Sequence, residues 1–354
     1  MKNYKIAAIP GDGIGSEVIS AGVEVLQYLA DQGNNFTVDI ETFPWGAEYY
    51  LKNGQMMPDD GLETLKIFDA IYFGSAGDPR IPDHITLWQL RLKICQGFEQ
   101  YANVRPSRVL PGVKSPLANI NSGDFDWVIV RENSEGEYAG IGGRAHTNFP
   151  EEVGMDVSVF TRSGVERIHR FAFELARSRP RKLLTLVTKS NAQRHGMVMW
   201  DDIYRKVKLE YPDVETDKML VDAMTTRMVL DPSSLDVMVA TNLHADILSD
   251  LAAALSGSMG IAPTANLRPE GDFPSMFEPI HGSAFDIMGQ GIANPIGAFW
   301  SASMMLEHLG EKESAELLMT AIEKVTAKQE VLPKDLGGNA STRQVTDAVL
   351  AAIG

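Results

Sequence analysis

The sequence predicts an α/β fold built on a largely parallel sheet. Apolar runs of strand length alternate along the chain with segments whose apolar residues recur at helical spacing. Strands that alternate with helices in this way are typical of parallel sheets. The expected strands are residues 4–10, 68–76, 126–132, 182–189 and 235–242, and the expected helices are residues 16–31, 163–178, 197–209, 243–256 and 297–309.

Length and composition narrow the class of protein. The chain has 354 residues, enough for one large or two medium domains, and a formal net charge of −15. That charge disfavours nonspecific binding to nucleic acid or to anionic membranes. Cys95 is the only cysteine, which excludes an internal disulfide and favours a reducing, cytoplasmic setting. The sequence shows neither a signal-peptide core nor an apolar run long enough to span a membrane.

Several of the expected strands end in a polar residue that is followed by a break. In open α/β sheets, ligands bind at the carboxyl ends of the strands. We therefore expect these ends to contribute to one ligand site. They are Gly11–Asp12, Ser75–Ala76, Arg131–Glu132, Lys189–Ser190 and Asn242.

Two glycine-rich segments are candidates for ligand-binding loops. "GDGIGSE" (11–17) lies between a strand and a helix, but it reads G-x-G-x-G and no acidic residue follows at the distance that a Rossmann fingerprint requires. No Walker-type lysine loop occurs either, which argues against a kinase-like protein. "FEPIHGSAFDIMGQGIANP" (277–295) is too irregular for a core segment and suits a ligand loop, whereas 268–276 and 328–342 are expected to be surface loops.

Asp246 and Asp250 stand four positions apart in the expected helix 243–256, so both carboxylates lie on one helix face among apolar neighbours. Like charges at this spacing repel each other, and a divalent cation would remove the repulsion. Oxygen ligands without thiolates or paired histidines favour Mg²⁺ or Mn²⁺ over zinc. A solvated helix face is the alternative. Asp222 follows a short apolar run and is by itself either a further ligand or an N-cap.

Two arginines have positions that suit the binding of a carboxylate. Arg105 precedes a proline, which restricts its backbone to an extended conformation, and Arg131 ends an apolar strand. Fixed guanidinium groups can bind a carboxylate in bidentate fashion. For Arg131, a structural salt bridge with Glu132 or Glu135 is the alternative.

Lys189 also ends an apolar strand, where partial desolvation would lower its pKa and suit it to act as a base. Asn191 lies two residues further on. Tyr138, in the segment "NSEGEYAG", is either a proton donor or a packing residue.

Taken in order, "IPGDGIG", "YANVRP", "VRENSEGEYAG", "VTKSN", "VDAM", "NLHADILSD", "EPIHGSAFDI" and "IANP" resemble the β-decarboxylating 2-hydroxyacid dehydrogenases. This family includes isopropylmalate, isocitrate, D-malate and tartrate dehydrogenases, and the resemblance covers Ile6 to about Thr346. It implies a two-domain α/β fold that is not a Rossmann fold, with a long mixed sheet. One domain would combine residues 1–103 and 257–354, and residues 104–256 would form the metal, substrate and dimerisation domain.

The resemblance also implies the roles of site residues in a homodimer whose active sites are shared between protomers. Asp246 and Asp250 match the metal ligands of one protomer, and Asp222 matches the ligand from the other. Lys189 matches the catalytic lysine, also from the other protomer, and Tyr138 matches the tyrosine that protonates the product enol. The residues that match substrate contacts are Arg105, Arg131 and Asn191.

The cofactor implied by the resemblance is NAD. Asp286 falls where an acid binds the ribose hydroxyls, and it is followed by Ile287 where NADP-dependent relatives carry a lysine–tyrosine pair. Mg²⁺ or Mn²⁺ is the implied metal, and a requirement for a monovalent cation is left open. The cofactor-binding positions are Gly13, Ile14, Ser75, His281, Gly282, Ser283, Ala284, Asp286 and Asn294.

One position departs from the family pattern. The first substrate arginine usually lies ten residues before the arginine of N-x-R-P, and that position here is Cys95. Arg91 lies one helical turn earlier, where isopropylmalate enzymes carry an apolar residue that contacts the γ-substituent. We hypothesise that Arg91 contacts a polar γ-group of the substrate.

The segments "WGAEYY", "MMPDDGLETL", "IPDHITLW" and "FELARSRPRK" resemble the tartrate and D-malate branch of the family. We therefore expect NAD-dependent oxidation of a small hydroxy diacid, tartrate or D-malate, with or without β-decarboxylation. The alternatives are an isopropylmalate dehydrogenase and a regulatory, non-catalytic subunit of a decarboxylating dehydrogenase, which the change at Cys95 could indicate.

Overall fold

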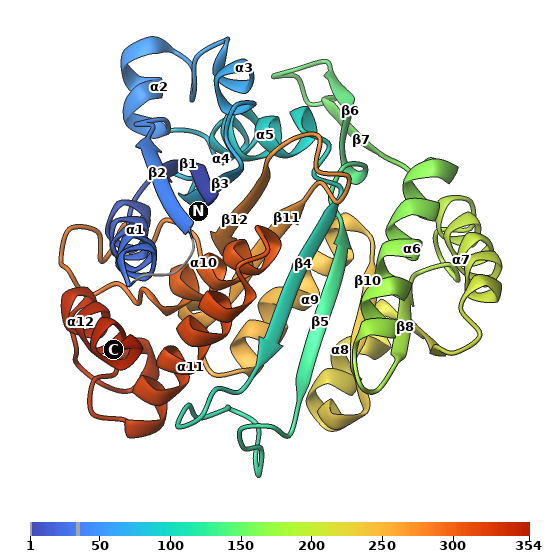
Figure 1. The fold of residues 1–354 in the computed structure, drawn as a ribbon. Helices are drawn as coiled ribbons and strands as arrows, with labels where there is room; N and C mark the ends of the chain where they lie inside the picture. The colour runs from blue at the N-terminus through green and yellow to red at the C-terminus, as the bar shows by residue number, and fades with distance from the viewer. Residues whose placement is uncertain (1, 33–35) are drawn as a thin grey trace. The chain divides into compact units, whose positions relative to one another are not determined.

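The computed structural model describes residues 2–32 and 36–354, and it divides into two compact units (Figure 1). Unit 1 comprises Met1–Gln100, Arg105–Asp124 and Ala253–Gly354, and unit 2 comprises Tyr101–Val104 and Phe125–Ala252. The predicted domain boundaries differ from these two units mainly at residues 105–124, which belong to unit 1. The reason is local packing, because Ser115 Oγ donates to the Leu255 carbonyl (2.6 Å) and Gln329 Nε2 donates to the Gly112 carbonyl (2.8 Å).

Ten strands follow the order β2-β1-β3-β12-β11-β4-β5-β10-β8-β9. The sheet is mixed, because β11 and β12 pair in antiparallel fashion whereas pairs such as β1–β3 and β5–β10 are parallel. The strands are β1 (Lys2–Gly11), β2 (Phe36–Thr42), β3 (Ala70–Ser75), β4 (Ala102–Arg108), β5 (Asp126–Glu132), β8 (Leu183–Thr188), β9 (Glu215–Leu220), β10 (Val237–Ala240), β11 (Pro263–Leu267) and β12 (Ser275–Pro279).

In unit 1, apolar helices pack against strands that are buried along most of their length. All six residues of β3 are buried, and the Tyr72 hydroxyl on this strand donates to the Ala298 carbonyl (2.6 Å) of α10. The helices of unit 1 are α1 (Gly15–Asp31), α2 (Ala47–Asn53), α3 (Gly61–Leu65), α4 (Asp83–Thr86), α5 (Leu92–Gly97), α10 (Ile296–His308), α11 (Lys312–Lys328) and α12 (Thr342–Ile353), with short turns η1 (Leu87–Arg91), η4 (Met259–Ile261) and η5 (Lys334–Leu336).

In unit 2, β5, β10 and β8 run parallel, so their carboxyl ends lie at the same edge. Ala240, the last residue of β10, pairs with Arg131 of β5, and the helix α9 begins two residues later. The helices are α6 (Arg162–Ser178), α7 (Gly196–Val207), α8 (Val221–Leu230) and α9 (Asn242–Leu255), with short turns η2 (Lys208–Glu210) and η3 (Pro232–Ser234).

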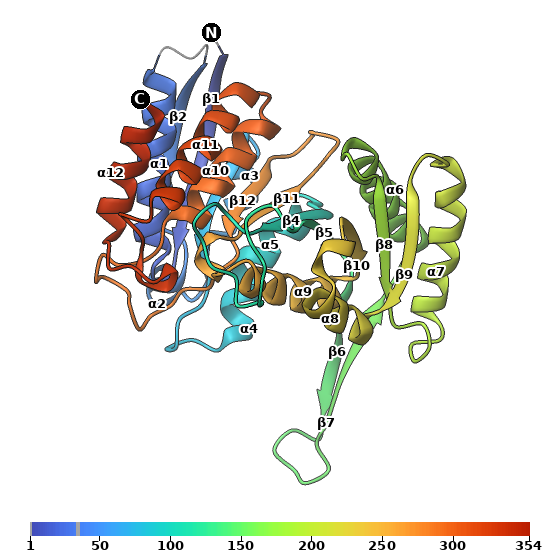
Figure 2. The ribbon, with the colours of Figure 1, turned by 90° about the horizontal axis from the view of Figure 1, so that it is seen from below.

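The strands β6 (Gly136–Ala145) and β7 (Val153–Val159) form a separate antiparallel hairpin. Figure 2 shows it extending away from the other helices and strands of unit 2. Most of its side chains are exposed, including Ile141, Val153 and Met155. Exposed apolar side chains on a projecting hairpin are typical of surfaces that bind another chain.

Within the described ranges, no helix combines the length and the apolar character needed to cross a membrane.

Candidate active site

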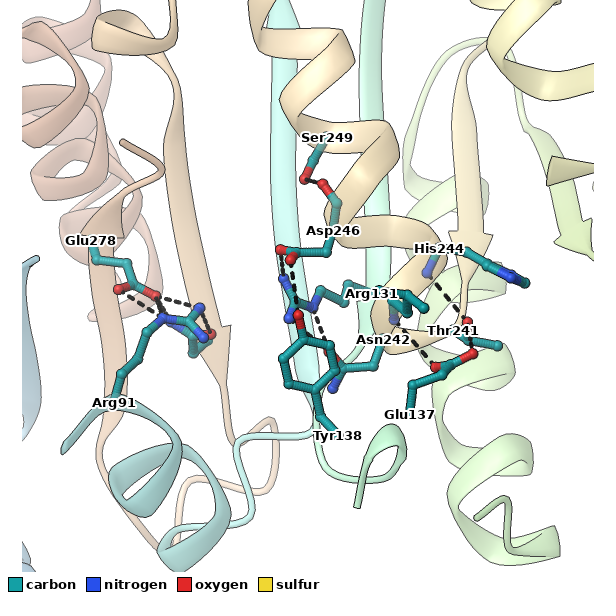
Figure 3. Close-up of polar contacts among 12 residues, drawn as sticks. Arg91, Arg131, Glu137, Tyr138, Thr241, Asn242, His244, Asp246, Ser249 and Glu278 are labelled. Atoms are coloured by element: carbon teal, nitrogen blue, oxygen red, sulfur yellow. Dashed lines mark hydrogen bonds and ion pairs between the residues drawn. The ribbon is translucent and has the colours of Figure 1, made fainter. Parts of the chain in front are cut away.

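Arg131, Asp246 and Tyr138 meet in unit 2 (Figure 3). The Arg131 side chain is only 2% exposed, and its Nη1 donates to Asp246 Oδ1. The Tyr138 hydroxyl donates to the other carboxylate oxygen of Asp246 (3.2 Å), and its ring centroid lies 5.4 Å from the Arg131 Cζ. Three residues predicted to act in one site are therefore brought together by β5, β6 and α9.

Asn242 completes the environment of the Arg131 guanidinium. Its Oδ1 accepts from Nε (3.0 Å) and Nη2 (2.6 Å) of Arg131. The predicted alternative, a salt bridge from Arg131 to Glu132 or Glu135, is not what these contacts show. Glu132 instead accepts hydrogen bonds from the Ser134 hydroxyl (2.5 Å) and from the Glu135 amide (2.9 Å), and burial raises the pKa of its carboxyl to about 7.

Lys189 and Asp222 form an ion pair at the neighbouring strand ends of unit 2. Thr188 at the end of β8 pairs with Leu220 at the end of β9, so the residues that follow both strands lie close together. The hydrogen bond from Lys189 lowers the pKa of the Asp222 carboxyl. Asp222 lies in the first turn of α8 rather than at its N-cap, and Asn191 is exposed.

The two acids of α9 form part of the predicted metal-binding set. Asp246 is partly buried and Asp250 is exposed, and both are oxygen donors of the kind that Mg²⁺ and Mn²⁺ prefer. Across residues 2–32 and 36–354, no cluster of three or more His, Cys, Asp or Glu side chains is placed to hold a metal ion. The donor chemistry of the two acids nevertheless fits a hard divalent cation.

Arg91 ends a π-helical turn in unit 1 (η1) and is held by acidic and amide side chains (Figure 3). Its Nε donates to both oxygens of Glu278 (2.8 and 3.1 Å), and its Nη2 lies 2.7 Å from Glu278 Oε1. Asn266 donates to the same carboxylate (2.7 Å). Cys95 lies instead in the apolar core with residues such as Phe98. The Arg91 charge is therefore largely offset by Glu278.

Arg105 lies in β4, in the part of the strand that belongs to unit 1, and it is 5% exposed.

Unit 1 contains a pocket of about 520 Å³ at the predicted cofactor loop. Four of the predicted cofactor-binding residues line it, and sequence reasoning missed Lys334 and Asp335, which line it from another loop. Asn294 Nδ2 donates to Asp335 Oδ2 (2.9 Å), which links the two loops. The sequence predicts a surface loop at 328–342, and nothing in the composition of this segment marks Asp335 as a pocket-lining residue. The four predicted residues are Ile14, His281, Asp286 and Asn294.

The remaining predicted cofactor residues shape the backbone beside this pocket. Gly13 has a φ of +56°, and a Cβ atom there would lie 1.9 Å from the Ser283 carbonyl oxygen, so the turn requires glycine. The Ile14 amide donates to that same carbonyl (2.8 Å). Ser75 is buried and its hydroxyl donates to the Asp12 carbonyl (2.7 Å). Gly282 and Ala284 flank Ser283 in the same loop.

Sequence reasoning also missed Glu137, Thr241 and Glu278. Glu137 lies beside Tyr138 in its motif, and Glu278 opens the "EPIHGS" motif, so each was close to a recognised signal. Thr241, which donates to Glu137, lies 104 positions away along the chain, and Arg91, which donates to Glu278, lies 187 positions away. The sequence does not reveal such pairings.

Known proteins resemble this chain along nearly its whole length. Residues 5–349 match the isocitrate/isopropylmalate dehydrogenase family. The chain is 68% identical over 353 residues to a protein from Agrobacterium vitis named probable tartrate dehydrogenase/decarboxylase, covering 100% of this chain and 98% of that one. It is 50% identical over 360 residues to the decarboxylating D-malate dehydrogenase of Escherichia coli, covering 100% and 99%.

Among solved structures, isocitrate dehydrogenase from Methylococcus capsulatus superposes with a TM-score of 0.89 at 34% identity, covering 99% of both chains. This likeness confirms the predicted α/β fold, and the family match confirms the resemblance seen in the motifs. The chain therefore belongs to the isocitrate/isopropylmalate dehydrogenase family.

Proposed function

We propose that this protein oxidises a small 2-hydroxy diacid, tartrate or D-malate, with NAD and a divalent cation, with or without β-decarboxylation. It is an enzyme of the tartrate dehydrogenase/decarboxylase and D-malate dehydrogenase type. The observation that carries the proposal is the convergence of Arg131, Tyr138 and Asp246 in a chain so similar to enzymes with those names.

Different side chains have different roles in the proposed reaction. Asp246, Asp250 and Asp222 from the other protomer would hold the cation. A cation bound there would supply polarisation of the C2 oxygen, and NAD would supply the hydride acceptor. Lys189 removes the proton of the C2 hydroxyl, and Tyr138 donates a proton to the carbon that loses CO₂.

Substrate carboxylates need cationic partners that are already oriented. Arg131 is held by Asn242 and Asp246, so its planar guanidinium has a fixed direction. Arg105, on a buried strand, and Asn191 are the other proposed contacts. Arg91 contacts a polar γ-group of the substrate, and its pairing with Glu278 favours a hydroxyl over a second carboxylate there.

The proposed cofactor is NAD rather than NADP. Asp286 lines the unit 1 pocket, where its carboxylate suits the ribose hydroxyls and would repel a 2′-phosphate. Ile287 follows it in the same lining and offers no positive charge. A requirement for a monovalent cation is tested by adding K⁺ to the substrate assays.

The proposed assembly is a homodimer with shared active sites. Leu243 and Ile247 are exposed on α9, four positions apart and therefore on one face. The hairpin residues Ile141, Val153 and Met155 provide a second exposed apolar surface. Two such surfaces on unit 2 suit an isologous interface.

The decisive experiment is a substrate panel with the purified chain. Tartrate stereoisomers, D-malate and isopropylmalate are each supplied with NAD or NADP and with Mn²⁺ or Mg²⁺, and the absorbance of the reduced cofactor is followed. Turnover of tartrate or D-malate with NAD supports the proposal. Preference for isopropylmalate would assign the alternative dehydrogenase, and no turnover by a folded protein would favour the regulatory subunit.

A further inference from the structure

Glu137 links the first residues of β6 to the N-terminus of α9 (Figure 3). One carboxylate oxygen accepts from the Thr241 hydroxyl (3.1 Å), and the other accepts from the Leu243 amide (3.2 Å). Leu243 lies in the first turn of α9, where backbone N–H groups have no partner within the helix. The positive end of the helix dipole also favours a carboxylate at this place.

The residues on either side of Glu137 lie beside the same helix. A Cβ atom at Gly136 would lie 3.7 Å from the Asn242 Cβ, and Gly136 has a φ of +77° that side chains rarely adopt. Tyr138, the next residue, donates to Asp246 one turn further along α9. Three consecutive residues therefore follow the first two turns of the helix, and Glu137 supplies the two hydrogen bonds in the middle.

We propose that Glu137 is a positioning residue that holds the Tyr138 hydroxyl at the reacting carbon. This inference rests on the proposed function, because it assigns Glu137 a part in the proton donation by Tyr138. Tyr138 lies at the base of an exposed hairpin. The hydrogen bonds that the preceding residue, Glu137, makes to α9 therefore decide where this strand lies. Without Glu137, the strand can shift along the helix, and a displacement of about 1 Å can lower a rate about 100-fold.

A matched control exists two residues earlier. Glu135 accepts from the Thr161 amide (2.9 Å) and hydroxyl (2.7 Å) at the N-terminus of α6. The chemistry is the same, a carboxylate bound to a threonine hydroxyl and an amide at a helix start. No predicted site residue lies on α6, so Glu135→Ala reports the cost of losing such a contact without the effect on Tyr138.

The first measurement uses the protein without substrate. Hydrogen exchange at the Leu243 amide accelerates in Glu137→Ala and not in Glu135→Ala, because only the first variant removes its acceptor. Unchanged exchange at Leu243 in Glu137→Ala overturns the proposed link. This readout does not depend on catalysis, so it stands even if the substrate panel fails.

The second measurement is a double-mutant cycle with D-malate, NAD and Mn²⁺. Glu137→Ala lowers kcat about tenfold or more with little change in KM, and Glu137→Gln, which keeps one acceptor oxygen, restores much of the loss. In the Tyr138→Phe background, Glu137→Ala lowers kcat by less than about twofold, because the residue acts through Tyr138. Glu135→Ala leaves kcat within about twofold of wild type.

Equal losses in both backgrounds, or an equal loss in Glu135→Ala, would overturn the proposal and assign Glu137 a purely structural role. Failure of the wild-type chain to oxidise D-malate or tartrate would instead refute the proposed function. The two failures are therefore separable.

Discussion

Asp246 and Asp250 carry two negative charges on one face of α9, and Arg131 offsets one of them. The Arg131 guanidinium binds Asp246 directly, and Tyr138 donates to the same carboxylate. Asp250 lies one turn further on and is exposed. The repulsion expected from the sequence is therefore reduced by a residue 115 positions away from Asp246.

Asp250→Asn tests the metal-binding role at a single residue. The substitution keeps the size of an exposed side chain, so we expect a change in Tm of less than about 3 °C. Loss of one anionic oxygen donor should weaken Mn²⁺ binding about tenfold or more. Calorimetric titration with Mn²⁺ and NADH formation measure the two effects. The exposed Asp31→Asn on α1 serves as control, and unchanged Mn²⁺ affinity in Asp250→Asn would contradict the assignment.

Arg91→Leu tests how the substrate's γ-group is selected. In the single variant, Glu278 stays buried without its cation, which destabilises the fold by about 3–5 kcal/mol. The double variant with Glu278→Leu removes both charges and is the proper comparison. We expect kcat/KM for tartrate, whose C3 hydroxyl Arg91 is proposed to contact, to fall about tenfold or more relative to isopropylmalate. Unchanged ratios in both variants would remove support for a role of Arg91 in selectivity.

At the scale of elements, apolar patterns predicted the buried strands and helices well. The expected strand 126–132 is β5 itself, and the expected helix 163–178 differs from α6 by one residue. Sequence reasoning missed the hairpin of β6 and β7, although apolar residues alternate with Gly154, Asp156 and Ser158 along β7. Its strands are mostly exposed, and among the element contacts of the described residues β6 packs mainly on β7.

The packing of α6 on α7 makes stability depend on pH through His169. The ring is fully buried against Trp200 and Tyr204 (centroids 4.6 and 5.4 Å away), and burial lowers the pKa of His169 from 6.5 to about 3. Between these values the unfolded chain binds a proton that the folded chain does not. The free energy of unfolding therefore decreases as pH falls below 6.5, by about 2 kcal/mol at about pH 5.

His169→Leu removes this contribution, so urea unfolding should depend less on pH between about 7 and 5 than it does for wild type. The exposed His84→Gln should leave the pH dependence as it is. An equally steep dependence in His169→Leu would show that other groups dominate acid destabilisation.

For the whole molecule, the motifs identified the family and most of the candidate site, but not how the residues pair. Arg131 meets Asn242 because β5 and β10 are parallel neighbours, although β8 and β9 lie between them in the sequence. The chain order of strands does not reveal their order in a sheet. The same limit applies to Arg91 and Glu278, which are 187 positions apart. Motifs therefore predicted which residues to consider, and the sheet order decides what each one contacts.

The proposed sharing of active sites can be tested by mixing two inactive variants. Lys189 and Asp222 form an ion pair, so we expect one protomer to contribute both residues to the active site of the other. Asp250 is expected to act in the active site of its own protomer. Lys189→Ala and Asp250→Asn homodimers should each be inactive. After the two chains are unfolded and refolded together, a hybrid dimer has one intact site, so about a quarter of wild-type activity should return. Lys189→Ala mixed with Asp222→Asn is the matched control. Both residues are contributed to the other protomer's site, so each active site of this hybrid receives one of the two substitutions and stays inactive. Recovery in the control, or none in the first mixture despite proven hybrid formation, would contradict a site built from two chains.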